Sequence, residues 1–173
     1  MLSRRSFINT TLAAGTALAA QGMQKVMAQS KRTIVDAQAH LWKAESEDWK
    51  WVPGRKPQLP EPFTIEKLVA LMDEGGVDRV VIVPPSWPGD RNDYALEAAS
   101  RYPNRFAVMG RIALEKPESA ALLPKWKAQP GMKRIRLTFQ REQAAMLQHA
   151  DWVFPAAEKA GVPIMFFAPD NLA

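Results

Sequence analysis

Three polar side chains occupy positions where the chain could bind or polarise a small molecule. Gln38 and His40 follow an apolar run at residues 33–37, and Arg136 lies toward the end of another run at 133–137. Because side chains alternate along a strand, Gln38 and His40 face the same side. In α/β folds chemistry takes place at the carboxyl edge of the sheet, so we expect both at the mouth of a site. A buried charge must be paired or face a ligand, so Arg136 is expected to bind a substrate carboxylate or to form a salt bridge with a residue beyond Ala173.

Aromatic and polar residues elsewhere are weaker candidates. Four tryptophans lie in the predicted loops, at Trp42, Trp49, Trp51 and Trp87. We expect them to pack these loops, with Trp42 and Trp87 as the candidates for a wall of the substrate pocket. His149 precedes a predicted helix and is interpreted as a solvated capping residue. Asp170 follows the last apolar run and is interpreted as a turn residue.

The elements that must position these side chains alternate in type along the chain. Short β-branched and apolar runs predict five strands, at 33–37, 79–83, 106–110, 133–137 and 163–167. Helical spacing and end signals predict helices after Thr64, from Asp93 to Tyr102, from Pro117 to the Pro130–Gly131 stop, and before Gly161. The last four strands recur about every 30 residues, which is the length of one strand-helix-strand unit. The fold class is therefore α/β with a parallel sheet.

Two architectures fit this alternation. One is an open doubly wound sheet, and the other is the first five strands of an eight-stranded barrel. No Gly-x-Gly-x-x-Gly motif follows the first strand and no phosphate-loop motif is present, so the nucleotide-binding versions of the open sheet lose support. The segment 41–63 is rich in Trp and Pro and has no period of its own, as is typical of a functional lid.

The segment around His40 resembles the amidohydrolase superfamily, in its amidohydrolase-related branch of small barrel hydrolases, lactonases and decarboxylases. That family typically opens with Asp-x-His-x-His and often a following Trp, and this chain carries Asp36, Gln38, His40 and Trp42 in those places. Further similarity lies in segments 71–85, 92–95, 102–106, 131–137 and 160–164. The resemblance implies that residues 29–173 form an incomplete (β/α)8 TIM barrel, with about five of the eight parallel strands.

Two departures from the family pattern concern the metal. Gln38 replaces the first metal-binding histidine, and Phe166-Phe167-Ala168 stands where many relatives place another. The family's later histidine and aspartate would lie beyond Ala173. A catalytic zinc site needs about three protein ligands. The resemblance therefore implies at most one divalent metal ion, zinc by expectation, on His40 and weakly on Gln38; a metal-free variant, in which His40 and Arg136 polarise the substrate directly, stays open.

The family implies hydrolysis of a C–O or C–N bond in a small carboxylate or lactone, or a decarboxylation. Two other interpretations remain: a non-catalytic exported binding protein on the same scaffold, and an inactive fragment. A reading frame that continued beyond Ala173 with a further histidine and aspartate would favour the enzyme.

The amino terminus predicts export. Arg4 and Arg5 precede a charge-free, mildly apolar stretch from Ser6 to Gln24, and Val26-Met27-Ala28 offers a cleavage site after Ala28. Ala17-Leu18-Ala19 is the competing site. A twin-arginine signal at residues 1–28 implies the twin-arginine export machinery as a partner and a periplasmic or secreted product.

Composition narrows the remaining classes. Removal of residues 1–28 takes away three basic residues and no acid, so the formal charge falls from +5 to +2. No basic run or stripe remains, which argues against nucleic acid as a partner. The signal stretch is too polar for a stable membrane span, and none is expected after cleavage. The absence of cysteine excludes disulfides, so the domain depends on its core, or on a metal, for stability.

Overall fold

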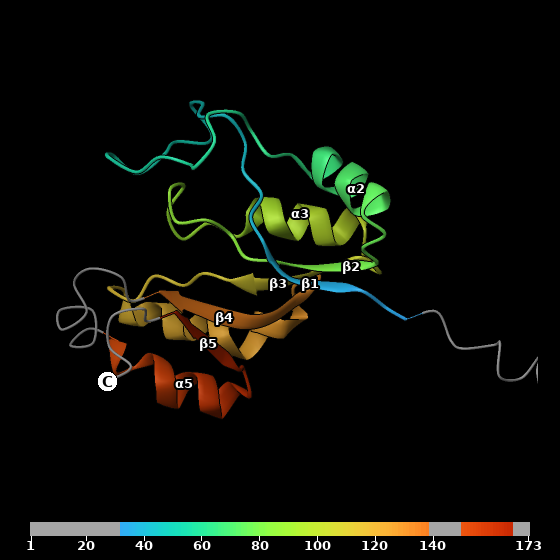
Figure 1. Ribbon diagram of the computed structural model, residues 1–173. Coiled ribbons are helices and arrows are strands. Elements are labelled where there is room, and N and C mark those ends of the chain that lie inside the picture. Colours follow the sequence, from blue (N-terminus) through green and yellow to red (C-terminus); the bar gives the residue numbers. More distant parts are fainter. Residues whose placement is uncertain (1–31, 139–149, 168–173) are drawn as a thin grey trace, which may run out of the picture. The chain divides into compact units, whose positions relative to one another are not determined.

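The structure is a computed structural model that describes residues 32–138 and 150–167 (Figure 1). The predicted signal at 1–28, His149 and Asp170 lie outside the described residues. The chain divides into two compact units, Met1–Thr33 and Ile34–Ala173. Only two described residues, Arg32 and Thr33, belong to the first unit, and every described strand and helix belongs to the second.

Five parallel strands form one sheet. They are β1 (Val35–Ala39), β2 (Arg79–Ile82), β3 (Phe106–Gly110), β4 (Met132–Thr138) and β5 (Ile164–Phe167). Their spatial order is β1-β2-β3-β4-β5, so each strand pairs with its neighbour in sequence. A doubly wound sheet reverses its strand order at a switch point, whereas a barrel is wound in one direction. The sheet is a curled half-barrel, which confirms the predicted α/β incomplete TIM barrel (Figure 1).

Helical segments connect the strands. They are α2 (Ile65–Glu74), α3 (Asp93–Arg101), η1 (Pro117–Ala128) and α5 (Val153–Ala160). Helix α3 packs against β3, η1 packs against β4, and α5 packs against η1. The predicted cap of α2 is confirmed, because the Thr64 side chain accepts from the Lys67 backbone N–H at 3.3 Å. None of the described helices is both long and apolar enough to cross a bilayer.

One predicted helix has a different geometry. Segment η1 is a 3-10 helix throughout its twelve residues instead of an α-helix. Pro124 lies inside it and has no backbone N–H to donate, so a regular α-helical ladder cannot form there. Buried Leu123 and Trp126 hold the segment on the sheet. The predicted stop is confirmed: Gly131 has φ +70°, and a Cβ there would lie 2.5 Å from the Ala99 Cβ.

Strand β1 begins and ends two residues later than predicted, and the reason lies in its pairing. The register with β2 shifts between Asp36 and Ala39, which marks a β-bulge or similar irregularity. The Asp36 carboxylate accepts from the Gln38 backbone N–H at 2.9 Å within this irregular stretch. Bulges re-aim side chains and are frequent beside functional sites. Gln38 is therefore part of the edge strand and does not follow it.

The loop 41–63 is anchored at both ends. The Trp42 N–H donates to the Phe63 carbonyl at 3.1 Å, which forms an isolated antiparallel bridge. Trp49 is buried in the main hydrophobic core together with Leu41 and Ile65. The loop backbone also reaches the segment after β2, because the Val52 N–H donates to the Trp87 carbonyl at 2.7 Å. These contacts fix the loop beside the carboxyl ends of β1 and β2.

Candidate functional site

A cavity of about 280 Å³ lies at the carboxyl ends of the strands, and we call it the arginine pocket. Its lining residues are Gln38, His40, Gln58, Val83, Pro84, Pro85, Ser86, Trp87, Arg111, Arg136, Thr138 and Phe167. All five strands contribute, either with a residue near the strand end or with the segment that follows. The structure thus brings together four of the predicted site residues, namely Gln38, His40, Trp87 and Arg136.

His40 is held in one orientation by Val83, the residue that follows β2. Its Nδ1 lies 2.6 Å from the Val83 carbonyl oxygen, and the Val83 N–H donates to the Ala39 carbonyl at 2.9 Å. A carbonyl oxygen can only accept, so Nδ1 carries the proton of the neutral ring and Nε2 keeps its lone pair. The Trp87 ring packs edge-on against the imidazole, with centroids 6.1 Å apart. The arrangement leaves Nε2 as the nitrogen that can bind a metal or accept a proton.

Arg136 is the one charged side chain in the described buried core, at 7% exposure. Its Nη1 donates to Gln38 Oε1 at 2.9 Å and contacts the Met165 sulfur at 3.5 Å. Its guanidinium also lies over the Phe167 ring, 5.2 Å from the centroid. Among the described residues it contacts no carboxylate, and its Nε has no acceptor. The described residues supply no partner for a salt bridge with Arg136, and the salt bridge to a residue beyond Ala173 stays a prediction.

A second guanidinium, Arg111, shares this pocket. Its Nε lies 3.3 Å from Asp90 Oδ1, without hydrogen-bond geometry. The Asn92 side chain fixes the Arg111 backbone from both sides, accepting from its N–H at 2.7 Å and donating to its carbonyl at 2.9 Å. Burial lowers the pKa of Arg111, the Asp90 charge opposes that shift, and the Arg55 charge adds to it.

The two arginines affect each other through their charges. Burial lowers the pKa of the Arg136 guanidinium, and the positive charge of Arg111 lowers it further. Arginine stays charged in proteins, so this lowering reflects a charge that burial destabilises and does not indicate deprotonation. No Asp or Glu occurs among the lining residues that the structure describes. The lining of the arginine pocket therefore carries an excess of positive charge, and Asp90, which pairs with Arg111 from outside the lining, offsets part of it.

The two predicted tryptophans have different places. Trp87 lines the arginine pocket, and its indole N–H is buried without an acceptor among the described groups. Trp42 does not line it. Instead, Trp42 packs edge-on against Trp87 at 5.5 Å between centroids and stacks on Phe63 at 5.6 Å. Trp42 thus supports the pocket wall from behind.

Sequence reasoning missed several lining residues, of which Arg111 is the most consequential. It follows the last residue of β3, as His40 follows the last residue of β1. The rule that selected His40, a polar residue directly after a strand, would also have selected Arg111. Thr138 at the end of β4 meets the same rule. Gln58 could not be found in this way, because it comes from the long loop.

The described residues fit a metal ion only in part. His40 offers a free Nε2, whereas the Gln38 oxygen already accepts from a guanidinium, which repels a second cation. No group of three or more His, Cys, Asp or Glu side chains is placed to hold a metal within residues 32–138 and 150–167. The described part of the chain thus provides one suitable ligand, His40.

The strands follow one another in sequence order around a half-barrel, and the pocket lies at their carboxyl ends. Both features are typical of (β/α)-barrel proteins. The family model described as amidohydrolase matches residues 35–171, so the chain belongs to the amidohydrolase family. No curated protein sequence matches the chain.

Solved structures share the fold at low sequence identity. One is a probable 2-pyrone-4,6-dicarboxylic acid hydrolase from Acinetobacter baumannii with citric acid bound, at 20% identity and TM-score 0.58, over 80% of this chain and 50% of that one. A second is the manganese complex of 5-carboxyvanillate decarboxylase from Novosphingobium aromaticivorans, at 19% identity and TM-score 0.57, over 79% and 50%. A third is a zinc-bound amidohydrolase from Burkholderia multivorans, at 21% identity and TM-score 0.52, over 70% of this chain and 43% of that one. The chain spans about half the length of the first two.

Proposed function

We propose that the arginine pocket binds the carboxylate of a small substrate that the protein hydrolyses or decarboxylates. The observation that carries this proposal is the pair Arg111 and Arg136 in a pocket whose described lining contains no acidic side chain. Arg111 pairs with the Asp90 carboxylate, whereas Arg136 meets no carboxylate among the described residues. A buried guanidinium without such a partner is costly unless an anion completes the site. The similar structures support the same class of ligand, because one holds citric acid and another is named a carboxyvanillate decarboxylase.

Calorimetry with a charged ligand and its neutral methyl ester tests this proposal. Citrate is expected to bind to the wild-type chain at low ionic strength, and its affinity is expected to fall as salt is added, because the attraction is electrostatic. Trimethyl citrate keeps the carbon skeleton but has no carboxylate, and it is expected to bind at least about tenfold more weakly. Equal affinity for the two ligands, or affinity independent of salt, would contradict the proposal.

His40 is the residue that we propose for the chemical step. Its Nε2 would hold a divalent metal, for which the manganese and zinc structures are precedents, and such a metal would polarise a carbonyl group. Arg136 would hold the substrate carboxylate and orient the bond to be broken toward the imidazole. A second candidate function is that of a binding protein without catalysis. The hydrogen bond between Gln38 and Arg136 favours it, because the residue at the position of a metal ligand is here part of a pair suited to binding an anion.

We propose in addition that the protein is exported. Arg4 and Arg5, followed by a charge-free stretch, support a twin-arginine signal that ends at Ala28. Replacing both arginines by lysine is expected to leave the full-length precursor in the bacterial cytoplasm, whereas the wild type yields a periplasmic product that begins at Gln29. Cell fractionation and N-terminal mass spectrometry measure this outcome. Unchanged processing of the double variant would refute the twin-arginine assignment.

A further inference from the structure

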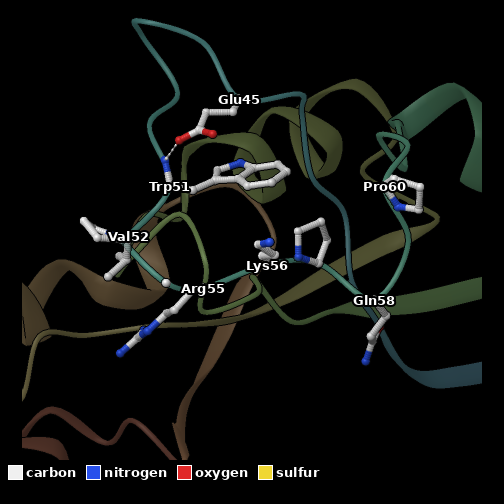
Figure 2. A pocket seen from close by; sticks show the side chains of 10 residues that line it. Glu45, Trp51, Val52, Arg55, Lys56, Gln58 and Pro60 are labelled. Carbon is white, nitrogen blue, oxygen red and sulfur yellow. Dashed lines mark hydrogen bonds between the residues drawn. The ribbon is translucent and has the colours of Figure 1, made fainter.

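A second cavity, distinct from the arginine pocket, lies within the long loop 41–63. It measures about 560 Å³, and we call it the loop cavity (Figure 2). Its lining residues are Glu45, Trp51, Val52, Pro53, Gly54, Arg55, Lys56, Pro57, Gln58 and Pro60. The larger part of this wall is apolar, and three proline rings and one indole make up much of it. The flat face of an indole and the apolar faces of proline rings form good packing surfaces for another ring.

The acidic residue of this wall is already engaged. Glu45 Oε1 accepts from the Trp51 backbone N–H at 3.1 Å, and this bond fixes the point from which the indole extends into the cavity (Figure 2). The indole N–H of Trp51 is buried and has no acceptor among the described residues. Glu45 therefore serves to position Trp51, and the surface offered to a ligand is the indole itself.

The loop cavity and the arginine pocket share a wall. Gln58 lines both cavities. Arg55, from the loop cavity, donates from Nη1 to the carbonyl of Ser86, which lines the arginine pocket, at 2.9 Å. The side chains of Arg55 and Gln58 point away from the Trp51 indole (Figure 2). The two cavities are thus adjacent, with Gln58 between them.

Positive charge continues from one cavity to the other. The charge of Arg55 acts on Arg111, and the charge of Arg111 acts on Arg136. Arg55 lines the loop cavity, and Arg111 and Arg136 line the arginine pocket. An anion with an apolar extension matches this arrangement, with the charge at the arginines and the extension against the loop.

We propose that the loop cavity is a second subsite for the same substrate, and that it binds an aromatic ring attached to the carboxylate held by Arg111 and Arg136. This proposal rests on the proposed function, and it specifies the substrate class as an aryl-bearing small carboxylate. Trp51 and the prolines provide the packing surface for the ring, and Gln58 lies beside the linker between ring and carboxylate.

A ligand pair that differs only in the ring tests the subsite. Succinate and 2-benzylsuccinate carry the same two carboxylates, and calorimetry on the full chain gives the affinity of each. The wild type is expected to bind 2-benzylsuccinate about tenfold more tightly or better, because burial of a phenyl ring contributes on this scale. In Trp51→Ala the advantage of the ring is expected to fall below about threefold, while succinate affinity stays within about twofold of wild type.

Two more variants separate a lost contact from a disturbed loop. Val52→Ala trims the wall but keeps the backbone bond from Val52 to Trp87, and it is expected to reduce the ring advantage by about threefold. Leu59→Ala changes an exposed apolar residue of the same loop that does not line the cavity, and both affinities should stay the same.

The outcomes distinguish this inference from the proposed function. If succinate binds and the ring adds nothing, or if the ring advantage survives Trp51→Ala, the second subsite is refuted and the carboxylate site stands. If neither ligand binds, the carboxylate site fails, and the subsite proposal fails with it. A ring advantage that is lost in Trp51→Ala and kept in Leu59→Ala supports the subsite.

Discussion

Replacing Arg136 by methionine is expected to weaken the binding of a small carboxylate at least about 30-fold. Removal of one partner from a buried, hydrogen-bonded charge pair costs about 2 kcal/mol or more. Arg136 is nearly fully buried, and among the described residues the one oxygen that accepts from its guanidinium is Oε1 of Gln38. Calorimetric titration with citrate measures the loss, and the salt dependence of the affinity should become shallower.

The same variant should not destabilise the ligand-free protein. Methionine keeps much of the apolar volume of arginine and removes a buried charge that meets no carboxylate in the described structure. The free energy of unfolding, measured with urea, is therefore expected to stay constant or to rise by about 1 kcal/mol. Arg134→Met is the matched control, because Arg134 is an exposed arginine of the same strand. A similar loss of affinity in both variants would contradict a specific role for Arg136.

Replacing His40 by asparagine is expected to lower turnover by about 1,000-fold, a typical effect of removing a group that transfers a proton or holds a catalytic metal. Asparagine can still donate to the Val83 carbonyl from its side-chain amide, so the contact made by Nδ1 is kept. It offers no counterpart of Nε2. The variant thus removes Nε2, which is proposed for the chemical step, and keeps a substitute for Nδ1, which anchors the ring.

Turnover of small lactones and of aromatic carboxylates measures this effect, with added Mn²⁺ or Zn²⁺ and without metal. Carboxylate affinity of His40→Asn should remain within about threefold of wild type, because Arg111 and Arg136 are unchanged. His149→Asn is the control, since His149 is the other histidine of the chain and is predicted to have no site role. Full activity in His40→Asn would leave His40 as a packing residue and would favour the binding-protein alternative.

The parts of the fold that the sequence predicts well are those set by local patterns. The four later strands and the cap at Thr64 follow from apolar runs and from a side chain that completes a helix end. The placement of β1 was wrong by two residues because its bounds depend on pairing with β2, where the register shifts beside Gln38. The 3-10 geometry of η1 was missed although Pro124 was visible, since its apolar residues also suit an α-helix.

The candidate site was predictable only where it follows strand ends. Gln38, His40 and Arg136 lie on or directly after strands, and the sheet order brings them together. The bond between Gln38 and Arg136 joins residues 98 positions apart, and no local pattern indicates such a pair. The same limit applies to Gln58 and Trp51, whose positions depend on how an aperiodic loop packs.

The strictly sequential order of the sheet has a consequence for how the molecule opens. Every ladder joins a strand only to its predecessor and successor, as in solenoid repeats, where stability is close to a sum over neighbouring units. Opening can then start at a terminal unit without breaking the ladder between β2 and β3. Backbone amides of β5 are thus expected to exchange with solvent through partial opening, and those of β3 through unfolding of the whole unit. Because the Arg136 guanidinium lies over the Phe167 ring of β5, a ligand bound to that arginine is expected to slow amide exchange in β5.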